Sequence, residues 1–537
     1  MVVIPVQFQD RSFATSEEEL REVVTASQDY FNDQYDGSVR FTFDMASVVT
    51  LSEDASYYGS NYSDRRDVLL HRAVREACRS LSSGIDFSRY DNDADGVVDN
   101  VFLITAGMSE SEGAGAEWIW PQHGFLSDNG GTEQVGSVLV NGFSVCTEFT
   151  SSEQSRSGSG IFCHEFGHVL GLVDLYDTDG EGSGGLSSGL FNMALMDDGC
   201  KRGDGNDPPC FSAVDLEMLS LGKRGTLSKG HHRLPPVETS RSYLKADADR
   251  EGEHFLFECR KGRGLVVYHI DRSSADAGYS DYYKKNLTAA QRWEYSQVNC
   301  RPDRQCAYVV TDSSRGLDGI YFREGSFGSD TNPSFRYWSG ATSSLAITGI
   351  KLEADGSVSF DVVEPIVLKS TTAFQDAVIV GWSVAEELSG ITSFDVLWTD
   401  GVTERSMTLP AGSVSCTVEG LSPQTLYRIT VRANSSDGGA FSANTTIATK
   451  IRRDDSYPYI YLSGSDRTHD GRFTVGTRIP LRVFNAVEVQ EIRWYFDGER
   501  ISTGADGYYT ITRAGQLKAE IVHDDGSKEV IVKKICL

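Results

Sequence analysis

Helical periodicity is confined to about the first 232 of the 537 residues, and this asymmetry constrains the fold more than any other feature of the sequence. In that part, apolar residues at helical spacing alternate with short runs typical of buried strands. After it, short strand patterns dominate. Since 537 residues also exceed what one hydrophobic core normally supports, we predict a multidomain chain in which an α/β domain precedes all-β parts.

The first part is predicted to begin with a strand near residues 2–9 and a helix over about 16–34. Ser16-Glu17-Glu18-Glu19 supplies a capping pattern at the start of that helix. A second helix is predicted over about 64–82, because apolar residues from Leu70 to Leu81 recur on one helical face.

Two strand features follow these helices. The run Val97–Thr105 indicates one buried strand. Val135–Phe149 indicates a β-hairpin that turns at Asn141-Gly142, a dipeptide favoured in two-residue hairpin loops. Strands and helices therefore alternate over residues 1–232, and residues 233–364 are predicted to be a β-rich extension of the same unit.

Two all-β modules are expected after the extension. Residues 366–450 carry short strands at regular turn spacing. With Trp382 upstream, they resemble a fibronectin type III module in which Tyr427 is the corner tyrosine. Residues 454–537, with a strand and turn over 492–498, resemble an immunoglobulin-like or polycystic-kidney-domain-like module. We expect both modules to be β-sandwiches that serve as spacers or adhesive arms.

The charge and hydropathy of the chain argue against two classes of partner. The formal charge of −27 arises from 77 acidic against 50 basic residues, and the sequence has no basic stripe that could neutralise nucleic acid. No apolar run is long enough to span a bilayer. The sequence shows no signal peptide and opens on a strand pattern, so Met1 is interpreted as an expression addition or the edge of a trimmed precursor. We expect a monomer.

Ten cysteines are modest for this length. Cys200 with Cys210, and Cys300 with Cys306, each flank a short loop that could close as a disulfide in an oxidising compartment, and we expect at least one of these pairs to be bonded. Four other cysteines lie within apolar or regular patterns and are predicted to be small core residues: Cys78, Cys163, Cys259 and Cys416.

The segment His164-Glu165-Phe166-Gly167-His168 carries the candidate chemistry. In a helix, His164 and His168 lie one turn apart on the same face, so both imidazoles can reach one zinc ion. Glu165 falls beside the metal, where its carboxylate can take a proton from metal-bound water and pass it to the leaving amine. The competing interpretation is an exposed amphipathic helix with two unrelated histidines.

The continuation of the segment favours the metal site. Gly171 can end the helix in a left-handed conformation and return the chain toward the metal, which makes Asp174 a natural third ligand. Three protein ligands leave a fourth position open for water, as a catalytic zinc requires. A thermolysin-like alternative would use a downstream glutamate such as Glu217, but the sequence around Glu217 is more typical of a packing helix.

An acidic loop before the strand at Val97 indicates a structural calcium site. Oxygen donors stand at alternate positions and Gly96 occupies the sixth, as in a calcium loop, yet Phe102 replaces the glutamate of an EF-hand. The predicted ligands are Asp91, Asp93, Asp95, the carbonyl of Val97 and Asp99. An ordinary solvated turn is the alternative.

From His164 to Asp174, the sequence resembles the extended zinc signature of the immune inhibitor A family, secreted bacterial metallopeptidases related to the metzincins. Residues 175–179 resemble the continuation of that signature, and residues 192–199 resemble its methionine turn. The resemblance implies that Met196 forms the apolar floor of the zinc site, with Met193 less favoured.

The likeness covers roughly residues 1–364. It implies that a helix over Ser212–Leu219 closes the catalytic domain, and it includes residues 258–260 and 267–271 of the β-rich extension. Asp174 departs from the third histidine of the broader metzincin pattern but is similar to the third ligand of this family. The family also contains an acidic loop, which supports the calcium prediction.

These observations predict a secreted or cell-surface bacterial zinc endopeptidase that hydrolyses protein substrates, with host or matrix proteins among the candidates and Glu165 as general base and then acid. His123 could line the cleft, although a hydrogen-bonded structural role is favoured. The alternative is a degenerate peptidase-like protein that binds or adheres through its β modules.

Overall fold

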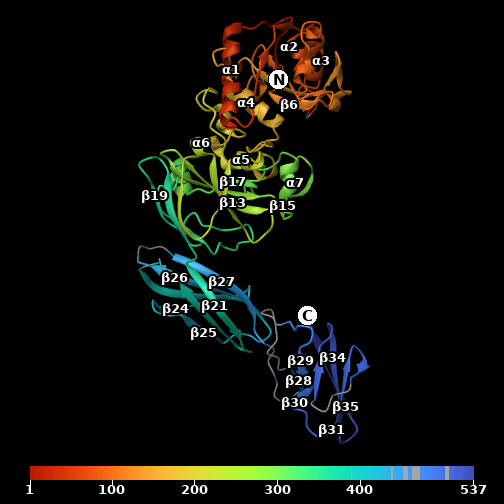
Figure 1. The fold of residues 1–537 in the computed structure, drawn as a ribbon, viewed down its shortest axis with the longest axis vertical. Coiled ribbons are helices and arrows are strands. Elements are labelled where there is room, and N and C mark those ends of the chain that lie inside the picture. The colour runs from red at the N-terminus through yellow and green to blue at the C-terminus, as the bar shows by residue number, and fades with distance from the viewer. Residues whose placement is uncertain are drawn as a thin grey trace. The chain divides into compact units, whose positions relative to one another are not determined.

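The computed structural model describes residues 1–537 except 64, 387, 389, 437–439, 451–457, 463–471 and 502–506. The chain divides into two compact units (Figure 1). The first comprises Met1–Val367 with Val384–Phe394 and Arg432–Ala443, and the second comprises Leu368–Ser383, Asp395–Val431 and Asn444–Leu537. Among the described residues, no helix combines the length and apolarity needed to cross a membrane.

A six-stranded sheet in the order β2-β1-β5-β9-β6, with β3 beside β1, organises the N-terminal part of the first unit. Its strands are β1 (Val2–Gln7), β2 (Asp44–Met45), β3 (Val49–Thr50), β5 (Val101–Thr105), β6 (Gln122–Phe125) and β9 (Gly142–Thr147). The pairs are parallel except at one edge, where β6 runs antiparallel to β9. Helix α4 (Gly158–Val169) packs against β9 and β6 at this edge.

Helices cover both faces of the sheet because successive strand residues point to opposite sides. Val3 and Phe102 share a core with α1 (Glu17–Gln34) and α4 (Gly158–Val169). On the other face, Val2, Ile4 and Leu103 pack with α3 (Leu70–Leu81) and the short α2 (Ala55–Tyr58). Strands buried on both faces explain the continuous apolar runs in the sequence.

The predicted helices are present with adjusted ends. Ser16 caps α1: its Oγ accepts from Glu19 N at 3.4 Å, and the Glu19 carboxylate accepts from Ser16 N at 2.9 Å. The second helix begins at Leu70, six residues after the predicted start, and residue 64 itself lies outside the described residues.

The strand predicted over 97–105 is two strands in different sheets. β4 (Val97–Val98) pairs with β8 (Val138–Val140), whereas β5 enters the central sheet. Asp99 lies between the two strands, and its N donates to Tyr90 O at 3.0 Å. The chain thus leaves the sheet of β4 before it enters the central sheet as β5.

The hairpin predicted to turn at Asn141-Gly142 is wrong. β8 pairs antiparallel with β7 (Glu133–Val135), and the tight turn falls at Gly136, whose φ is +59°. β9 pairs instead with β5 and β6. All six residues of β9 are buried, so the central position in the large sheet outweighs the local turn preference of Asn-Gly.

The β-rich extension contains two main sheets, in the orders β10-β12-β13-β14-β17 and β11-β20-β19-β18, and a β15-β16 pair. Their strands are β10 (Lys223–Thr226), β11 (Gly230–Leu234), β12 (Ser242–Asp247), β13 (Glu253–Arg260), β14 (Gly264–Asp271), β15 (Asp276–Ser280), β16 (Lys285–Thr288), β17 (Ala307–Val309), β18 (Glu324–Phe327), β19 (Ala346–Leu352) and β20 (Val358–Val363). β11 runs across the boundary predicted at residue 232.

Three short helices accompany these sheets: α5 (Ala213–Met218), α6 (Val237–Ser240) and α7 (Ala289–Glu294). In Figure 1, α5 and α6 lie between the N-terminal helices and the sheets of the extension. Short 3-10 segments occur at Phe87–Tyr90, Glu110–Glu112, Leu126–Asn129, Gly182–Gly184, Phe191–Met193, Asp198–Lys201 and Ser313–Ile320. Phe31 of α1, Leu256 of β13 and Tyr268 of β14 belong to one hydrophobic core, so the N-terminal part and the extension are packed together.

The region that resembles fibronectin type III has a three-stranded sheet, β21-β22-β25, and a four-stranded sheet, β24-β23-β26-β27. The strands are β21 (Ile366–Ala373), β22 (Ala377–Val384), β23 (Ile391–Thr399), β24 (Glu404–Pro410), β25 (Ser415–Glu419), β26 (Leu426–Ser435) and β27 (Ala440–Ala448). Tyr427 is buried, and its hydroxyl accepts from Ser422 N at 3.0 Å, as expected of a corner tyrosine.

The C-terminal region is all-β where it is described. Its sheets are β28-β30, β29-β33 and β32-β31-β34-β35, and the start predicted at residue 454 lies outside the described residues. The strands are β28 (Tyr459–Tyr461), β29 (Arg478–Pro480), β30 (Arg482–Phe484), β31 (Val489–Phe496), β32 (Glu499–Arg500), β33 (Tyr508–Thr510), β34 (Gly515–His523) and β35 (Lys528–Ile535). The strand and turn predicted over 492–498 correspond to β31 and its reversal into β32.

Candidate metal centre

The helix that carries the two histidines ends where the sequence predicts. α4 stops at Val169, and Gly171 follows with a φ of +100°. Leu172 N then donates to Gly167 O at 3.0 Å, which closes the end of the helix. A side chain at Gly171 would meet open space, so glycine is needed there for its backbone conformation.

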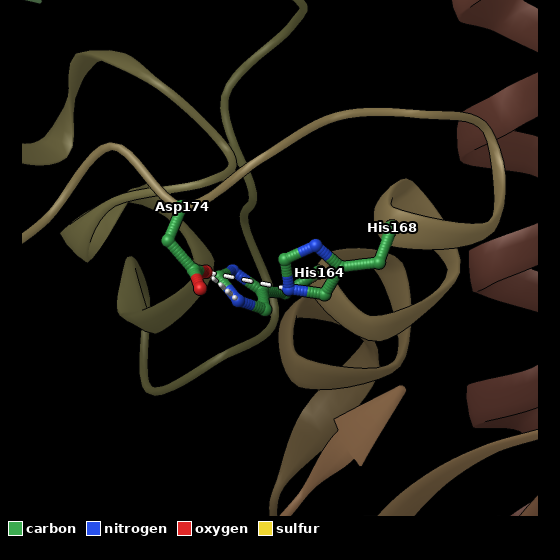
Figure 2. A group of neighbouring side chains, drawn as sticks. All are labelled: His164, His168 and Asp174. Carbon is green, nitrogen blue, oxygen red and sulfur yellow. Dashed lines mark ion pairs between the residues drawn. The ribbon is translucent and has the colours of Figure 1, made fainter. Parts of the chain in front are cut away.

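After this turn, Asp174 returns to face both histidines (Figure 2). Its Oδ1 lies 3.1 Å from His164 Nε2 and 3.3 Å from His168 Nε2. Burial opposes ionisation of Asp174, but the two imidazoles outweigh it and lower the pKa of the carboxyl below its ordinary value. The three predicted metal ligands therefore converge, with an ionised carboxylate among them.

Backbone carbonyls orient both imidazoles. His164 Nδ1 lies 3.2 Å from Leu195 O, and His168 Nδ1 lies 3.0 Å from Leu172 O. A protonated Nδ1 that donates to a carbonyl leaves the lone pair of Nε2 for a metal ion. These contacts favour the tautomer that a histidine ligand needs.

Glu165 is buried next to this cluster, at 5% exposure. Burial raises the pKa of its carboxyl to about 7. Its Oε2 is buried and has no hydrogen-bond partner among the described residues. A buried carboxylate oxygen without a partner is costly unless another group satisfies it, so the donor set fits a site built around a cation and a polar ligand.

Met196, the predicted floor of the zinc site, packs against α4. It is fully buried, and a Cβ added at Gly167 would sit 2.8 Å from Met196 Sδ. Met196 O also accepts from Leu175 N at 2.8 Å, which links the methionine turn to the segment that follows Asp174. Met193 faces elsewhere, since its Sδ lies 3.3 Å from the hydroxyl of Tyr321.

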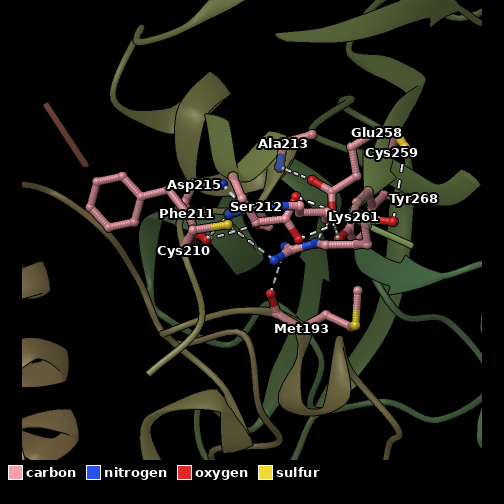
Figure 3. Close-up of polar contacts among 12 residues, drawn as sticks. Met193, Cys210, Phe211, Ser212, Ala213, Asp215, Glu258, Cys259, Lys261 and Tyr268 are labelled. Carbon is pink, nitrogen blue, oxygen red and sulfur yellow. Dashed lines mark hydrogen bonds and ion pairs between the residues drawn. The ribbon is translucent and has the colours of Figure 1, made fainter. Parts of the chain in front are cut away.

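A buried polar network that sequence reasoning missed supports the methionine turn from the extension (Figure 3). Arg260 donates to Met193 O at 3.0 Å, and Glu258 accepts from Tyr268 Oη and from Ala213 N, each at 2.6 Å. Glu258 and Arg260 also form a buried ion pair. The sequence signal that could have revealed this network is the presence of two charged residues, Glu258 and Arg260, at alternate positions of a strand whose eight residues are all buried.

Two aromatic rings flank the histidines. The Tyr176 ring lies 6.1 Å from that of His164, and the His123 ring lies 6.5 Å from that of His168. His123 also lies 3.1 Å from Ser144 Oγ through Nδ1, so it combines the structural contact favoured from the sequence with a place beside the centre. Burial lowers the pKa of His123 to about 4, which keeps it neutral.

Glu217 does not join this site, so the thermolysin-like alternative is wrong. Its carboxylate lies 2.7 Å from His254 Nε2 and 3.1 Å from Lys245 Nζ, in contacts with the extension. Those two partners lower the pKa of Glu217 to about 2 against the effect of burial. Its helix, α5, packs as predicted and is capped by Ser212.

Neither of the two candidate disulfides is formed, since all ten cysteines are free thiols, so the expectation that at least one pair is bonded was wrong. Cys210 Sγ instead accepts from Arg260 Nη1 at 3.3 Å, and Cys300 Sγ lies 3.2 Å from Thr178 Oγ1. One cysteine of each candidate pair is therefore engaged in a polar contact instead of a disulfide.

The acidic loop brings three of its five predicted ligands together. Asp91, Asp93 and Asp99 each offer a carboxylate oxygen within 4.8 Å of the others. Asp95 is outside this group, since its Oδ1 accepts from Val97 N at 2.7 Å. A strand follows the loop, so it is not an EF-hand, in agreement with the prediction.

Two regions of the chain match known protein families. Residues 5–225 match the immune inhibitor A peptidase M6 family, catalytic domain. The chain carries a peptidase M6 domain. Residues 365–448 match the fibronectin type III domain, which confirms the module predicted there.

Two curated relatives of the peptidase M6 domain are distant. Pre-pro-metalloprotease PrtV of Vibrio cholerae is 27% identical over 221 residues, which are 36% of this chain and 24% of that protein. Immune inhibitor A of Bacillus thuringiensis subsp. alesti is 26% identical over 216 residues, which are 35% of this chain and 31% of that protein. The matched region thus spans less than a third of the length of either relative. These matches support a metallopeptidase domain in the N-terminal part of the chain.

Proposed function

We propose that the chain is a secreted zinc-dependent endopeptidase that hydrolyses peptide bonds in protein substrates. The observation that carries the proposal is the approach of His164 Nε2 and His168 Nε2 to the same oxygen of Asp174, within 3.1–3.3 Å, beside the unpartnered Oε2 of Glu165. Two imidazoles and one carboxylate are a donor set that suits a catalytic zinc.

Each residue of the proposed site has a distinct role. His164, His168 and Asp174 hold the zinc ion, which when bound supplies a Lewis acid that activates water and polarises the scissile carbonyl. Glu165 takes a proton from the attacking water and later delivers it to the leaving amine. Met196 gives the site an apolar floor. The mixed sheet with an antiparallel edge strand next to α4 supports a metzincin-like catalytic domain.

The wider organisation is part of the same proposal. The catalytic domain covers 1–232, the β-rich extension 233–364, a fibronectin type III β-sandwich 366–450, and an immunoglobulin-like or polycystic-kidney-domain-like β-sandwich 454–537. We propose a monomer with a structural calcium ion held by the acidic loop, where the grouping of Asp91, Asp93 and Asp99 supports a cation. The substrates would be extracellular, host or matrix proteins among them.

The variant Glu165→Ala tests the mechanism. It should keep the fold and one zinc ion per chain but lose cleavage of casein, because the ligands remain while the proton acceptor is removed. Glu18→Ala, an exposed change on α1, is the matched control. Cleavage by the Glu165 variant at the wild-type rate would contradict the assigned role.

A degenerate peptidase-like binding protein is the competing function. The complete ligand set and the buried Glu165 disfavour it. Metal analysis separates the two: a chain that binds zinc tightly and cleaves casein in a chelator-sensitive manner supports the enzyme, whereas a zinc-free and inert chain supports the binding protein.

A further inference from the structure

A pocket of about 230 Å³ opens directly beside His164 and Glu165. Its other walls come from the 3-10 turn at Glu110–Glu112, the segment before β6, and the turn at Asp198–Lys201 that follows the methionine turn. Sites that enclose drug-sized ligands measure roughly 300–1,000 Å³, so this pocket has room for a single side chain. Because it adjoins Glu165, that side chain would belong to a substrate residue next to the scissile bond.

Carboxylates outnumber cations on the pocket walls. Besides Glu165, the lining residues include the carboxylates of Glu112 and Asp198 against the ammonium of Lys201, and Asp197, whose pKa burial raises to about 7. The two positive charges of a zinc ion would be matched by Asp174 and Glu165, so they do not alter the balance. The walls therefore carry a net negative charge.

Lys201 does not neutralise this charge, because two carboxylates share it. Its Nζ lies 3.5 Å from Glu112 Oε1 and 3.7 Å from Asp198 Oδ1. Asp197 lies deeper, at 4% exposure, and accepts from Leu190 N and Asp198 N. A second cation could therefore bind to Glu112 or to Asp198 while Lys201 keeps its contact with the other carboxylate.

The apolar walls suit the stem of a long cationic side chain. Ile161 and Trp120 line the pocket next to the histidine helix, and methylene groups of lysine or arginine pack well on such surfaces. An adjoining hollow of about 170 Å³ shares Ile161, Glu112 and Lys201 with the pocket and adds Asp204. A side chain that reached past Ile161 would meet a further carboxylate.

We propose that this pocket selects lysine or arginine in the substrate residue that flanks the scissile bond, with Asp198 and Glu112 as the specificity-determining residues. The selection is electrostatic, because a pocket whose walls carry a net negative charge attracts cationic side chains. This inference rests on the proposed peptidase function and names the substrate class of the same site.

The test uses the zinc-loaded full chain and quenched peptides. A mixed peptide library first locates the cleaved bonds. Peptides that differ only at one flanking position, with Lys, Arg, Gln or Glu there, are then compared. At low salt, kcat/KM for Lys or Arg should exceed that for Gln on the order of ten-fold, Glu should be the poorest, and the ratio should shrink in 0.5 M salt.

Variants that remove a carboxylate from the pocket wall should lower the ratio of kcat/KM for the Lys peptide to that for the Gln peptide, and a variant that removes Lys201 should raise it. Asp198→Asn and Glu112→Gln should each reduce the Lys/Gln ratio by roughly three-fold or more, since each removes one carboxylate. Lys201→Met should raise it, because the resident cation no longer competes. Glu18→Gln, which is exposed on α1, is the matched control and should leave the ratio unchanged.

The outcomes distinguish this inference from the function on which it rests. Cleavage of the library without preference for Lys or Arg, or a preference that Asp198→Asn and Glu112→Gln do not change, would overturn the pocket assignment alone. If the zinc-loaded chain cleaved no peptide at all, the proposed peptidase function would fail and the inference with it.

Discussion

Arg260 donates a hydrogen bond to the backbone carbonyl oxygen of Met193 at 3.0 Å, so a strand of the β-rich extension holds the start of the methionine turn. Arg260 is buried and paired with Glu258, which is fully buried. Met193 precedes Met196, the proposed floor of the zinc site, by three residues. The extension is thus tied through polar contacts to the segment that packs against helix α4.

Removal of this arginine should be strongly destabilising. Arg260→Met leaves the Glu258 carboxylate without its cationic partner, and breaking a buried ion pair from one side costs about 3–5 kcal/mol. Urea unfolding measures the loss. Arg21→Met, which breaks the exposed pair with Glu17, is the control and should cost less than about 1 kcal/mol. The double variant Glu258→Gln with Arg260→Met should be more stable than Arg260→Met alone; equal stabilities would contradict the role of the unpaired charge.

Gly167 should not tolerate a larger residue. The new Cβ of Gly167→Ala would lie 2.8 Å from Met196 Sδ, so the buried methionine must shift, at a cost of about 1–3 kcal/mol. Thermal unfolding of the zinc-loaded chain should show the loss. Gly84→Ala is the matched control, because its Cβ would make only an ordinary contact at 3.9 Å. A Gly167 variant as stable as the control would show that the floor is not packed against the helix.

Asp67 should make stability fall as the pH rises from about 4 to 7. Burial raises the pKa of Asp67 to about 7 from 3.8, so the folded chain binds a proton in that window which the unfolded chain has released. The folded-state advantage is complete below the unfolded pKa and disappears as the pH approaches 7, with a total change of up to about 4 kcal/mol.

Asp67→Asn removes this titration while the amide oxygen can still accept from Trp120 N, to which Asp67 Oδ2 now lies 2.9 Å away. Asp197 and Asp215 also have raised pKa values, so the informative quantity is the difference between the wild-type and variant stability curves from pH 4 to 8. Curves that run parallel throughout would refute the prediction.

Calcium should stabilise the N-terminal part through the acidic loop. Millimolar calcium should raise the unfolding temperature, because a ligand that binds only the folded state adds stability according to its concentration relative to its Kd. Asp93→Ala should abolish the shift, and Asp128→Ala, in the 3-10 turn at Leu126–Asn129, should preserve it. A shift that persists in the Asp93 variant would place any calcium site elsewhere.

The sequence by itself determined the arrangement of the candidate metal centre, because its parts are local. His164 and His168 share a face through helical spacing alone, and the left-handed conformation that favours glycine at Gly171 brings Asp174 back within a few residues. The capping of α1 by Ser16 and the corner tyrosine Tyr427 also depend on neighbouring residues and were predicted correctly.

Only the tertiary structure decided the features that depend on partners distant in the sequence. The division of residues 97–105 between two sheets, and the pairing of β9 with β5 rather than β8, follow from which strands are buried together. The contact of Arg260 with Met193 joins residues 67 positions apart. Local spacing carries no information about such pairings, because burial and hydrogen bonding across the folded chain outweigh the preference of a single turn or run.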